Sequence, residues 1–258
     1  MKSRIQWIMV LFLCTGFLCS ACAGDSEPSQ NTQPSVDRSG MTDPTEKSID
    51  TAFNTFLADM VLYNTLVPDE LNEILSEEPL PFLLDVRSKE EVEMYGRIEG
   101  AVVIPLRDIA KHTDQLPSFD TTIIAYCASG WRSTIAMTAL GALGWPNVRS
   151  IKGNSYFGWV EAGYPIVEGI PQASLLNAAQ PDAALLARFD TTLSSIPEDR
   201  GVITAETLYA EIKKNTEIIL VDVRRQEELN ETVLIEDAIN IPLDNFIDSK
   251  ANWPADKD

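Results

Sequence analysis

One cysteine of the chain stands where a nucleophile could be activated without help from a histidine. Cys127 follows a β-like run at residues 121–126, and a helix is expected to begin at Arg132. The N-terminus of a helix carries about half a positive charge, and the guanidinium adds a whole one. Both charges stabilise a thiolate, as do backbone N–H groups that converge on the sulfur. The segment predicts a nucleophilic cysteine that is activated by its local field rather than by a base.

The loop that begins at this cysteine supplies the other candidate site residues. We assign Cys127 the catalytic role and give a substrate-binding role to the five residues that follow it: Ala128, Ser129, Gly130, Trp131 and Arg132. Gly130 provides the backbone freedom that a tight turn needs. Trp131 either lines the mouth of the site and excludes water or packs on a neighbour. Cys127 as an inert buried thiol, and Arg132 as a surface residue at a helix start, are the simpler alternatives.

The composition argues against several other classes of protein. Twenty Lys and Arg against 39 Asp and Glu give a net charge of −19, which repels phosphate backbones, so nucleic acid is not an expected partner. His112 is the one histidine of the chain and lies in a polar stretch. It offers little support for a histidine-rich metal site or for Ser-His-Asp or Cys-His catalysis. We expect neither a metal ion nor a cofactor.

The elements that must position the loop alternate between strands and helices. Apolar runs predict strands at residues 82–84, 102–104, 121–126 and 148–151. Helical spacing and capping residues predict helices at 53–61, from Pro68, from Ser88, at 106–111, at 132–143, and around Trp159. This alternation predicts an α/β fold with a parallel sheet that is covered by helices on both faces. Cys127 would lie at the carboxyl edge of that sheet, where α/β proteins bind ligands.

Four motifs, in this order along the chain, resemble those of the rhodanese family. They are Asp85-Val86-Arg87, the run Gly96-Arg97-Ile98-Glu99-Gly100-Ala101, the C-x-x-G-x-R loop at 127–132, and Gly153 followed by Trp159 and Ala162-Gly163-Tyr164-Pro165. Arg97 stands where the family usually has His, and Asn154 replaces a second glycine. The resemblance covers about residues 66–167 and, in part, 201–258. It implies a rhodanese-like parallel sheet. We interpret Asp85 and Arg87 as a structural pair at a strand end, with contact to a substrate as the alternative.

The same resemblance implies sulfur transfer. Phosphatases and arsenate reductases of related fold need five residues between Cys and Arg, whereas Cys127 and Arg132 enclose four, a loop that fits a sulfane sulfur. Cys127 would take sulfur from a small donor such as thiosulfate, become a persulfide and pass the sulfur to a thiol or to cyanide. The alternative function is a non-catalytic binding or sensing module. A redox thiol is a weaker idea, because the globular part contains no resolving cysteine.

An internal repeat suggests a second, incomplete unit. Leu84-Asp85-Val86-Arg87 recurs as Val221-Asp222-Val223-Arg224, and Ile104-Pro105-Leu106 recurs as Ile241-Pro242-Leu243, both at an offset of 137 residues. A constant offset favours homologous units. The equivalent of Cys127 would fall at position 264, beyond Asp258, so the second copy lacks a cysteine loop. Either the sequence is a fragment, which we favour, or this copy is a degenerate remnant.

The N-terminus has the pattern of an export signal. Lys2 and Arg4 precede an apolar run at 7–18, which is shorter than a membrane span and is followed by small residues and Cys22. The pattern resembles a bacterial lipoprotein signal with Cys22 as the lipidated residue. A plain signal peptide cut near Ala21 or Ala23, or a short uncleaved anchor, is the alternative. We expect an exported protein on the outer side of the cytoplasmic membrane or in the periplasm, held to the membrane only by this lipid.

These patterns divide the chain into five segments. We predict a lipoprotein-type signal peptide at residues 1–22, a disordered tether at 23–50, a rhodanese domain at 51–170, a linker at 171–200, and a truncated second rhodanese-like domain at 201–258. The tether is rich in Ser, Thr, Pro and Gln and cannot bury enough apolar surface to offset the entropy of ordering. The predicted rhodanese domain itself is acidic, with eight Lys and Arg against sixteen Asp and Glu.

Overall fold

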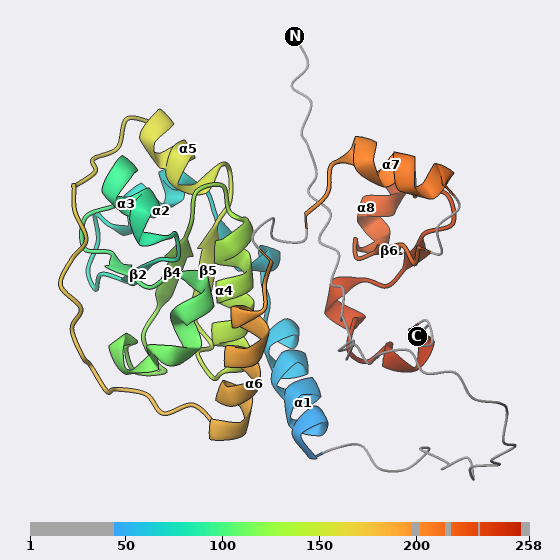
Figure 1. Cartoon of the computed structure of the whole chain (residues 1–258), viewed down its shortest axis with the longest axis horizontal. Helices are drawn as coiled ribbons and strands as arrows, with labels where there is room; N and C mark the ends of the chain where they lie inside the picture. Colours follow the sequence, from blue (N-terminus) through green and yellow to red (C-terminus); the bar gives the residue numbers. More distant parts are fainter. Residues whose placement is uncertain (1–43, 198–201, 215–217, 232, 254–258) are drawn as a thin grey trace, which may run out of the picture. The chain divides into compact units, whose positions relative to one another are not determined.

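Figure 1 shows the chain as a computed structural model, which describes residues 44–197, 202–214, 218–231 and 233–253. Cys22, the predicted signal peptide and residues 23–43 of the predicted tether lie outside the described residues. The larger of two compact units contains Thr45–Ile196 and Ile219–Asp258, and the smaller contains Pro197–Ile218. In the part of the chain that is described, no helix is both long enough and apolar enough to cross a bilayer.

A parallel sheet of five strands forms the centre of the larger unit. Its strand order is β1-β5-β4-β2-β3. The strands are β1 (Thr65–Leu66), β2 (Phe82–Asp85), β3 (Val102–Val103), β4 (Ile123–Tyr126) and β5 (Val148–Ile151). The predicted α/β class and four of these strands are therefore confirmed. β1 was not predicted, because Thr65 and Leu66 form no apolar run like that at 102–104; it pairs with β5 at the edge.

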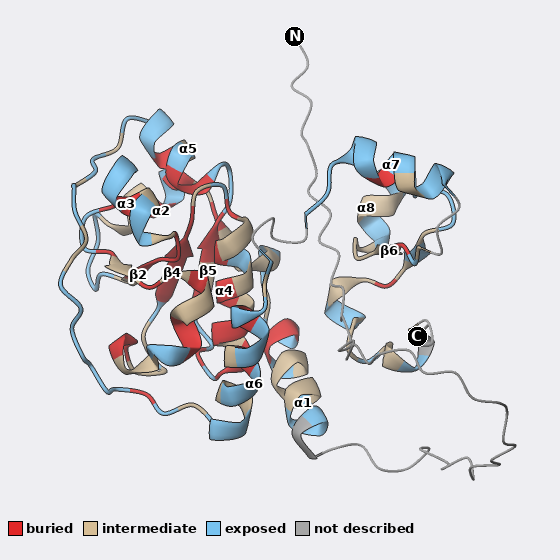
Figure 2. Cartoon of the chain, viewed as in Figure 1, coloured by how far each residue is buried: buried red, intermediate tan, exposed pale blue. Residues whose placement is uncertain are grey.

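Helices cover both faces of the sheet, as expected from the alternation of elements. The α-helices around it are α1 (Pro44–Ala58), α2 (Pro68–Ile74), α3 (Lys89–Tyr95), α4 (Trp131–Ala142), α5 (Ser155–Glu161) and α6 (Ala183–Ser194). Short 3-10 helices lie at η1 (Leu62–Asn64), η2 (Leu106–Lys111) and η3 (Thr113–Gln115). One apolar cluster joins the sheet to α1, η2, α4 and α6, and a second joins it to α2 and α5. Figure 2 shows β4, most of β2 and β5, and the inner sides of several helices as the buried part of the unit, whereas β3 is of intermediate burial.

The pleat of β4 decides which way the cysteine points. β4 lies between β5 and β2 and is buried at all four positions. Ala125 and Cys127 belong to the cluster under α4, whereas Ile124 and Tyr126 belong to the cluster under α5. Alternate side chains of a strand point to opposite faces. Cys127, which directly follows β4, therefore lies on the same side of the sheet as the helix that continues its loop.

Two predicted segment boundaries need correction. α1 begins at Pro44, so residues 44–50 of the predicted tether are helical. Phe56 and Leu57 are buried in the core, and the helix extends back through polar residues to a proline, which a first helical turn tolerates. The predicted linker at 171–200 contains α6, which Asp182 caps and which buries Phe189 and Leu193 against the same cluster. Its apolar residues, spaced at four, were the signal that the sequence analysis missed.

A buried ion pair holds the carboxyl end of β2. The Arg87 Nε donates to the Asp85 Oδ1 at 2.9 Å, Nη2 donates to Oδ2 at 2.5 Å, and both side chains are 0% exposed. The same Nη2 donates to the Gly96 carbonyl oxygen at 2.7 Å. The guanidinium carbon lies 3.7 Å from the centre of the Tyr156 ring. The pair therefore joins β2, the end of α3 and α5, which agrees with its interpretation as structural.

The same pair recurs in the C-terminal part of the chain. The Arg224 Nε donates to the Asp222 Oδ2 at 2.9 Å, but these side chains are 27% and 13% exposed. β6 (Val221–Asp222) and β7 (Ile239–Asn240) pair in parallel, with Val221 opposite Ile239, just as Leu84 lies opposite Val102 at the offset of 137. The local geometry thus repeats. That residues 201–258 begin a second rhodanese-like domain stays a prediction.

The remaining described elements are short. α8 (Gln226–Glu231), η4 (Leu243–Asn245) and η5 (Lys250–Asn252) accompany β6 and β7. α7 (Ala205–Lys213) is the helix of the smaller unit, and Thr204 caps it by accepting a hydrogen bond from the Thr207 amide.

We expect Arg87→Ala to lower the free energy of unfolding by about 3–5 kcal/mol, because it leaves the Asp85 carboxylate buried and unpaired. The matched control is Arg224→Ala, which breaks the same geometry where solvent reaches both side chains and should cost about 1 kcal/mol or less. Urea unfolding followed by the fluorescence of the buried Trp145 and Trp159 measures both values. Equal losses for the two variants would contradict the role of burial.

Candidate active site

The sulfur of Cys127 lies at the carboxyl end of the central strand, inside a curled loop. The residue is 1% exposed. Its amide donates to the Ser155 Oγ at 3.2 Å, and its carbonyl oxygen accepts from the Tyr156 amide at 3.0 Å, so the N-terminus of α5 fixes the backbone on both sides of the side chain. The Gly130 amide donates to the Cys127 Sγ at 3.2 Å. The loop therefore turns back over the sulfur, as the sequence predicts.

Gly130 makes this turn possible. Its φ is +111°, a left-handed conformation that side chains disfavour, and a Cβ at this position would lie 3.1 Å from the Ile151 carbonyl oxygen. Its own carbonyl oxygen accepts hydrogen bonds from the Ser133 Oγ at 2.9 Å and the Thr134 Oγ1 at 3.0 Å. α4 begins at the next residue, so the positive end of the helix acts on the loop.

The loop arginine forms an ion pair that the sequence analysis did not foresee. Both terminal nitrogens of Arg132 bind the Glu91 carboxylate: Nη2 donates to Oε1 at 2.6 Å, and Nη1 donates to Oε2. Glu91 also accepts from the Ser88 amide at 3.0 Å, as part of the capping box of α3. The Ser-x-x-Glu spacing was recognised as a helix cap, but nothing in the sequence shows that the same carboxylate reaches the loop.

Both partners respond electrostatically to this pairing. Burial, the largest single contribution, raises the pKa of Glu91, but hydrogen bonds from Arg132 and the Ser88 amide outweigh it, so the net pKa is lowered. Burial disfavours the charged form of Arg132 as well and so lowers its pKa, but Glu91 and the nearby Cys127 sulfur raise the pKa overall. A carboxyl group with a depressed folded-state pKa contributes stability at neutral pH that is lost as the pH falls through that value.

The pair changes one expectation about the site. Arg132 lies beside the sulfur, but its charge is balanced by Glu91 and is not available in full to an incoming anion. The stabilisation of a thiolate then depends more on the Gly130 amide and the start of α4 than the sequence suggests.

The other predicted loop residues are arranged in different ways. Trp131 is partly buried and packs against the cluster under α4, and its buried indole N–H has no hydrogen-bond partner among the described residues; its role at the mouth of the site stays a prediction. Ala128 is partly exposed and accepts from the Phe157 amide at 3.3 Å, and Ser129 is exposed. The contact of these residues with a substrate stays a prediction.

Arg97 and His112 have no contact with the loop among the described interactions. The Arg97 Nε donates to the Gly169 carbonyl oxygen at 3.0 Å, and its backbone forms a bridge with Val167. Arg97 therefore holds the segment that follows α5. His112 is exposed, as expected from its polar surroundings.

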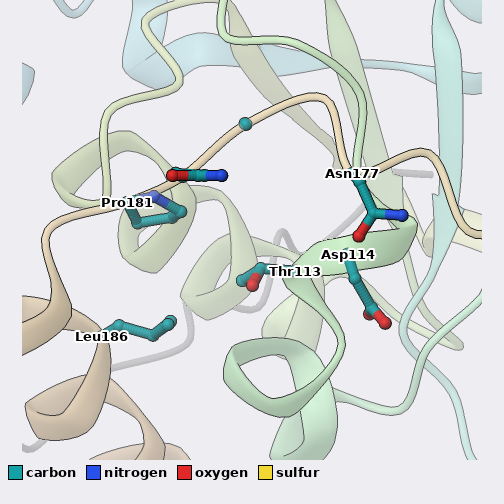
Figure 3. Close-up of a pocket in the computed structure, with 7 residues that line it drawn as sticks. Thr113, Asp114, Asn177, Pro181 and Leu186 are labelled. Atoms are coloured by element: carbon teal, nitrogen blue, oxygen red, sulfur yellow. The ribbon is translucent and has the colours of Figure 1, made fainter.

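A cavity of about 260 Å³ lies elsewhere in the larger unit (Figure 3). Its lining residues come from η3, the segment before α6, and α6 itself: Thr113, Asp114, Asn177, Ala179, Gln180, Pro181 and Leu186. The cavity therefore contains none of the predicted site residues. Within the described ranges, no group of three or more His, Cys, Asp or Glu residues is arranged to hold a metal ion.

A family model described as the rhodanese-like domain matches residues 67–162. The matched range contains β2, β4, Glu91 and the whole loop from Cys127 to Arg132. The chain therefore contains a rhodanese-like domain at these residues, in agreement with the resemblance found in the sequence. No curated protein matches the chain.

The chain is also similar to solved structures of small proteins. A rhodanese-related protein from Thermoplasma volcanium is 27% identical, with 41% of this chain and 98% of that one covered and a TM-score of 0.36. A protein from Rhodopseudomonas palustris, described as a possible tyrosine phosphatase, is 24% identical over 49% and 96%, with a TM-score of 0.36. A rhodanese-like domain protein from Staphylococcus aureus is 24% identical over 43% and 96%, with a TM-score of 0.33.

We expect Gly130→Ala to destabilise the loop, because alanine must adopt the positive φ, at about 1–3 kcal/mol, and also meets the Ile151 carbonyl oxygen. The control is Gly163→Ala, which has a φ of +80° but meets no atom within 4 Å, so it isolates the conformational cost. Urea unfolding and the rate of Cys127 alkylation measure the two effects. An alkylation rate that is unchanged in Gly130→Ala would show that the turn does not control the thiol.

Proposed function

We propose that the chain is a sulfurtransferase that carries sulfur as a persulfide on Cys127. The Cys127 thiolate attacks the outer sulfur of a donor such as thiosulfate, the sulfur–sulfur bond of the donor breaks, and sulfite leaves with the bonding electron pair. A thiol or cyanide then removes the outer sulfur, and the electron pair of the broken bond returns to Cys127. No cofactor takes part.

The observation that carries this proposal is the hydrogen bond from the Gly130 amide to the Cys127 Sγ at 3.2 Å, in a loop that leads into α4. A donor of this kind stabilises both the thiolate that attacks and the one that is released when the acceptor takes the sulfur. The loop encloses four residues between Cys127 and Arg132, a span suited to one extra sulfur atom. The rhodanese-like domain at 67–162 supports the same chemistry.

One observation favours the alternative, a non-catalytic binding or sensing module. Cys127 is 1% exposed and Arg132 is engaged by Glu91, so the site at rest offers little open surface. We also propose that the protein is exported and anchored through a lipid on Cys22. A lipid at the start of a polar segment would hold this domain at a membrane surface.

The test is an intact mass of the purified chain after incubation with thiosulfate, before and after cyanide. We expect one added sulfur atom that cyanide removes, and no addition in Cys127→Ser. The control Glu90→Gln, which changes an exposed residue of α3 outside the loop, should still load. No added sulfur with thiosulfate, mercaptopyruvate or polysulfide as donor would favour the binding module instead.

We expect Glu91→Gln to raise kcat/KM for thiosulfate by about tenfold, because it removes one negative charge near the path of a dianion while its amide oxygen can still accept from Arg132. The measurement is the rate of persulfide formation at low ionic strength. Glu90→Gln, on the same helix but exposed and not bound to the loop, should change the rate much less. A fall in kcat/KM for Glu91→Gln would mean that Glu91 acts mainly by holding Arg132 in place.

A further inference from the structure

Exposed apolar side chains gather beside the loop at the carboxyl edge of the sheet. We call this group the apolar rim: it consists of Met94, Tyr95, Phe157, Val160 and Ile166, which are between 38% and 71% exposed. Figure 2 shows the outer sides of α3 and α5, which contribute four of the five, as exposed surface. Single exposed apolar residues are ordinary, but a contiguous group marks an interaction site.

Contacts link the rim across two helices at Tyr95, Phe157 and Ile166, and Met94 and Val160 lie within one helical turn of Tyr95 and Phe157. The Tyr95 and Phe157 rings meet edge to face with their centres 5.7 Å apart, which joins α3 to α5. The Tyr156 hydroxyl donates to the Tyr95 carbonyl oxygen at 2.5 Å, which is a second link between α5 and the end of α3. The Ile166 Cδ1 lies 3.4 Å from where a Cβ of Gly96 would be, which places it next to the end of α3.

The rim also borders the reactive loop. The Phe157 amide donates to the Ala128 carbonyl oxygen at 3.3 Å, so α5 touches the loop directly. α3 is also bound to the loop, because its Glu91 accepts a hydrogen bond from Arg132. Both helices of the rim are thus bound to the segment that holds Cys127. A molecule that covers the rim would therefore lie beside that segment.

The charges around the rim select the kind of molecule. In the two segments that carry it, 88–99 and 152–168, five exposed carboxylates stand against two exposed lysines and the half-buried Arg97, which leaves two negative charges in excess; they are Glu90, Glu93, Glu99, Glu161 and Glu168 against Lys89 and Lys152. Arg132 does not offset this excess, since Glu91 balances it. Such a surface favours a basic partner and opposes a small anion.

We infer that the acceptor of the sulfur is a cysteine of a partner protein, carried on a protruding segment with apolar and basic side chains that docks on the apolar rim. This inference rests on the proposed function. The partner's thiolate attacks the outer sulfur of the Cys127 persulfide, the bond between the two sulfurs breaks, and the electron pair returns to Cys127. The protruding shape follows from the burial of Cys127, which a flat surface cannot approach.

The experiment measures the second half of the reaction in the full chain. Cys127 is first loaded with sulfur and the loading is verified by intact mass. The loaded protein is then mixed with one of three acceptors: a nine-residue peptide with one cysteine flanked by Leu and Lys, the same peptide with Glu in place of Lys, or cyanide. We expect transfer to the Lys peptide to be about tenfold faster than to the Glu peptide, because a tenfold difference in rate corresponds to a free-energy difference little larger than one good contact.

Two variants test the rim itself. Met94→Ser and Val160→Ser, which alter rim residues outside the loop, should slow transfer to the Lys peptide by about fivefold to tenfold and leave transfer to cyanide unchanged. The matched control is Leu80→Ser. It removes an exposed apolar side chain just before the amino end of β2, whereas the loop lies at the carboxyl ends of the strands.

Each other outcome counts against the inference. Equal rates with the two peptides, or equal slowing with cyanide, would show that the rim does not recognise a partner. A dimer of the chain that Met94→Ser dissolves would identify a second copy as the occupant instead. Failure of the proposed function is separate and visible, because Cys127 would then show no added sulfur in the loading step.

Discussion

The buried ion pair between Asp85 and Arg87 is the interaction on which the arrangement of the site depends. Arg87 reaches from the end of β2 to the Gly96 carbonyl oxygen and stacks on the Tyr156 ring. It thereby fixes the end of α3 and the start of α5, the two helices that contact the Cys127 loop. The Nη1 of Arg87 has no hydrogen-bond partner among the described residues, but its Nε and Nη2 bind Asp85 and Gly96 in a site closed to water, and breaking those bonds would leave buried charge unpaired, so this pair has little freedom to move. The loop is held in turn, because backbone amides of α5 donate to the Cys127 and Ala128 carbonyl oxygens.

Electrostatics in the site combine attraction at short range with repulsion at long range. The Gly130 amide and the N-terminus of α4 favour negative charge on the sulfur, over distances of a few ångströms. Glu91 and the surrounding carboxylates oppose negative charge in whatever approaches. The site thus places a hydrogen-bond donor against the sulfur and a carboxylate on the loop arginine. In the proposed sulfur transfer, the loop would hold the sulfur and the surface around it would select the acceptor.

The recurrence of the pair at Asp222 and Arg224 shows what burial adds. The hydrogen bonds and the strand register match those of the first copy, yet solvent reaches both side chains. Local sequence therefore suffices to form the pair and the short parallel ladder. The burial that makes the first pair a constraint comes from elements that surround it, such as Tyr156 of α5, which lies 69 positions further along the chain.

The sequence by itself determined the α/β class, four of the five strands of the main sheet, and the place of Cys127 at the end of β4. These features depend on runs and spacings of a few residues that are close together in the sequence. The apolar spacing of α6 was present in the sequence but overlooked, whereas the helical start of α1 consists of polar residues and gave no such signal. The sequence also could not reveal that Glu91 neutralises Arg132, because 41 positions separate them. Contacts between distant positions exist only once packing brings their helices together, so the balance of charge at the sulfur was decided by the tertiary structure alone.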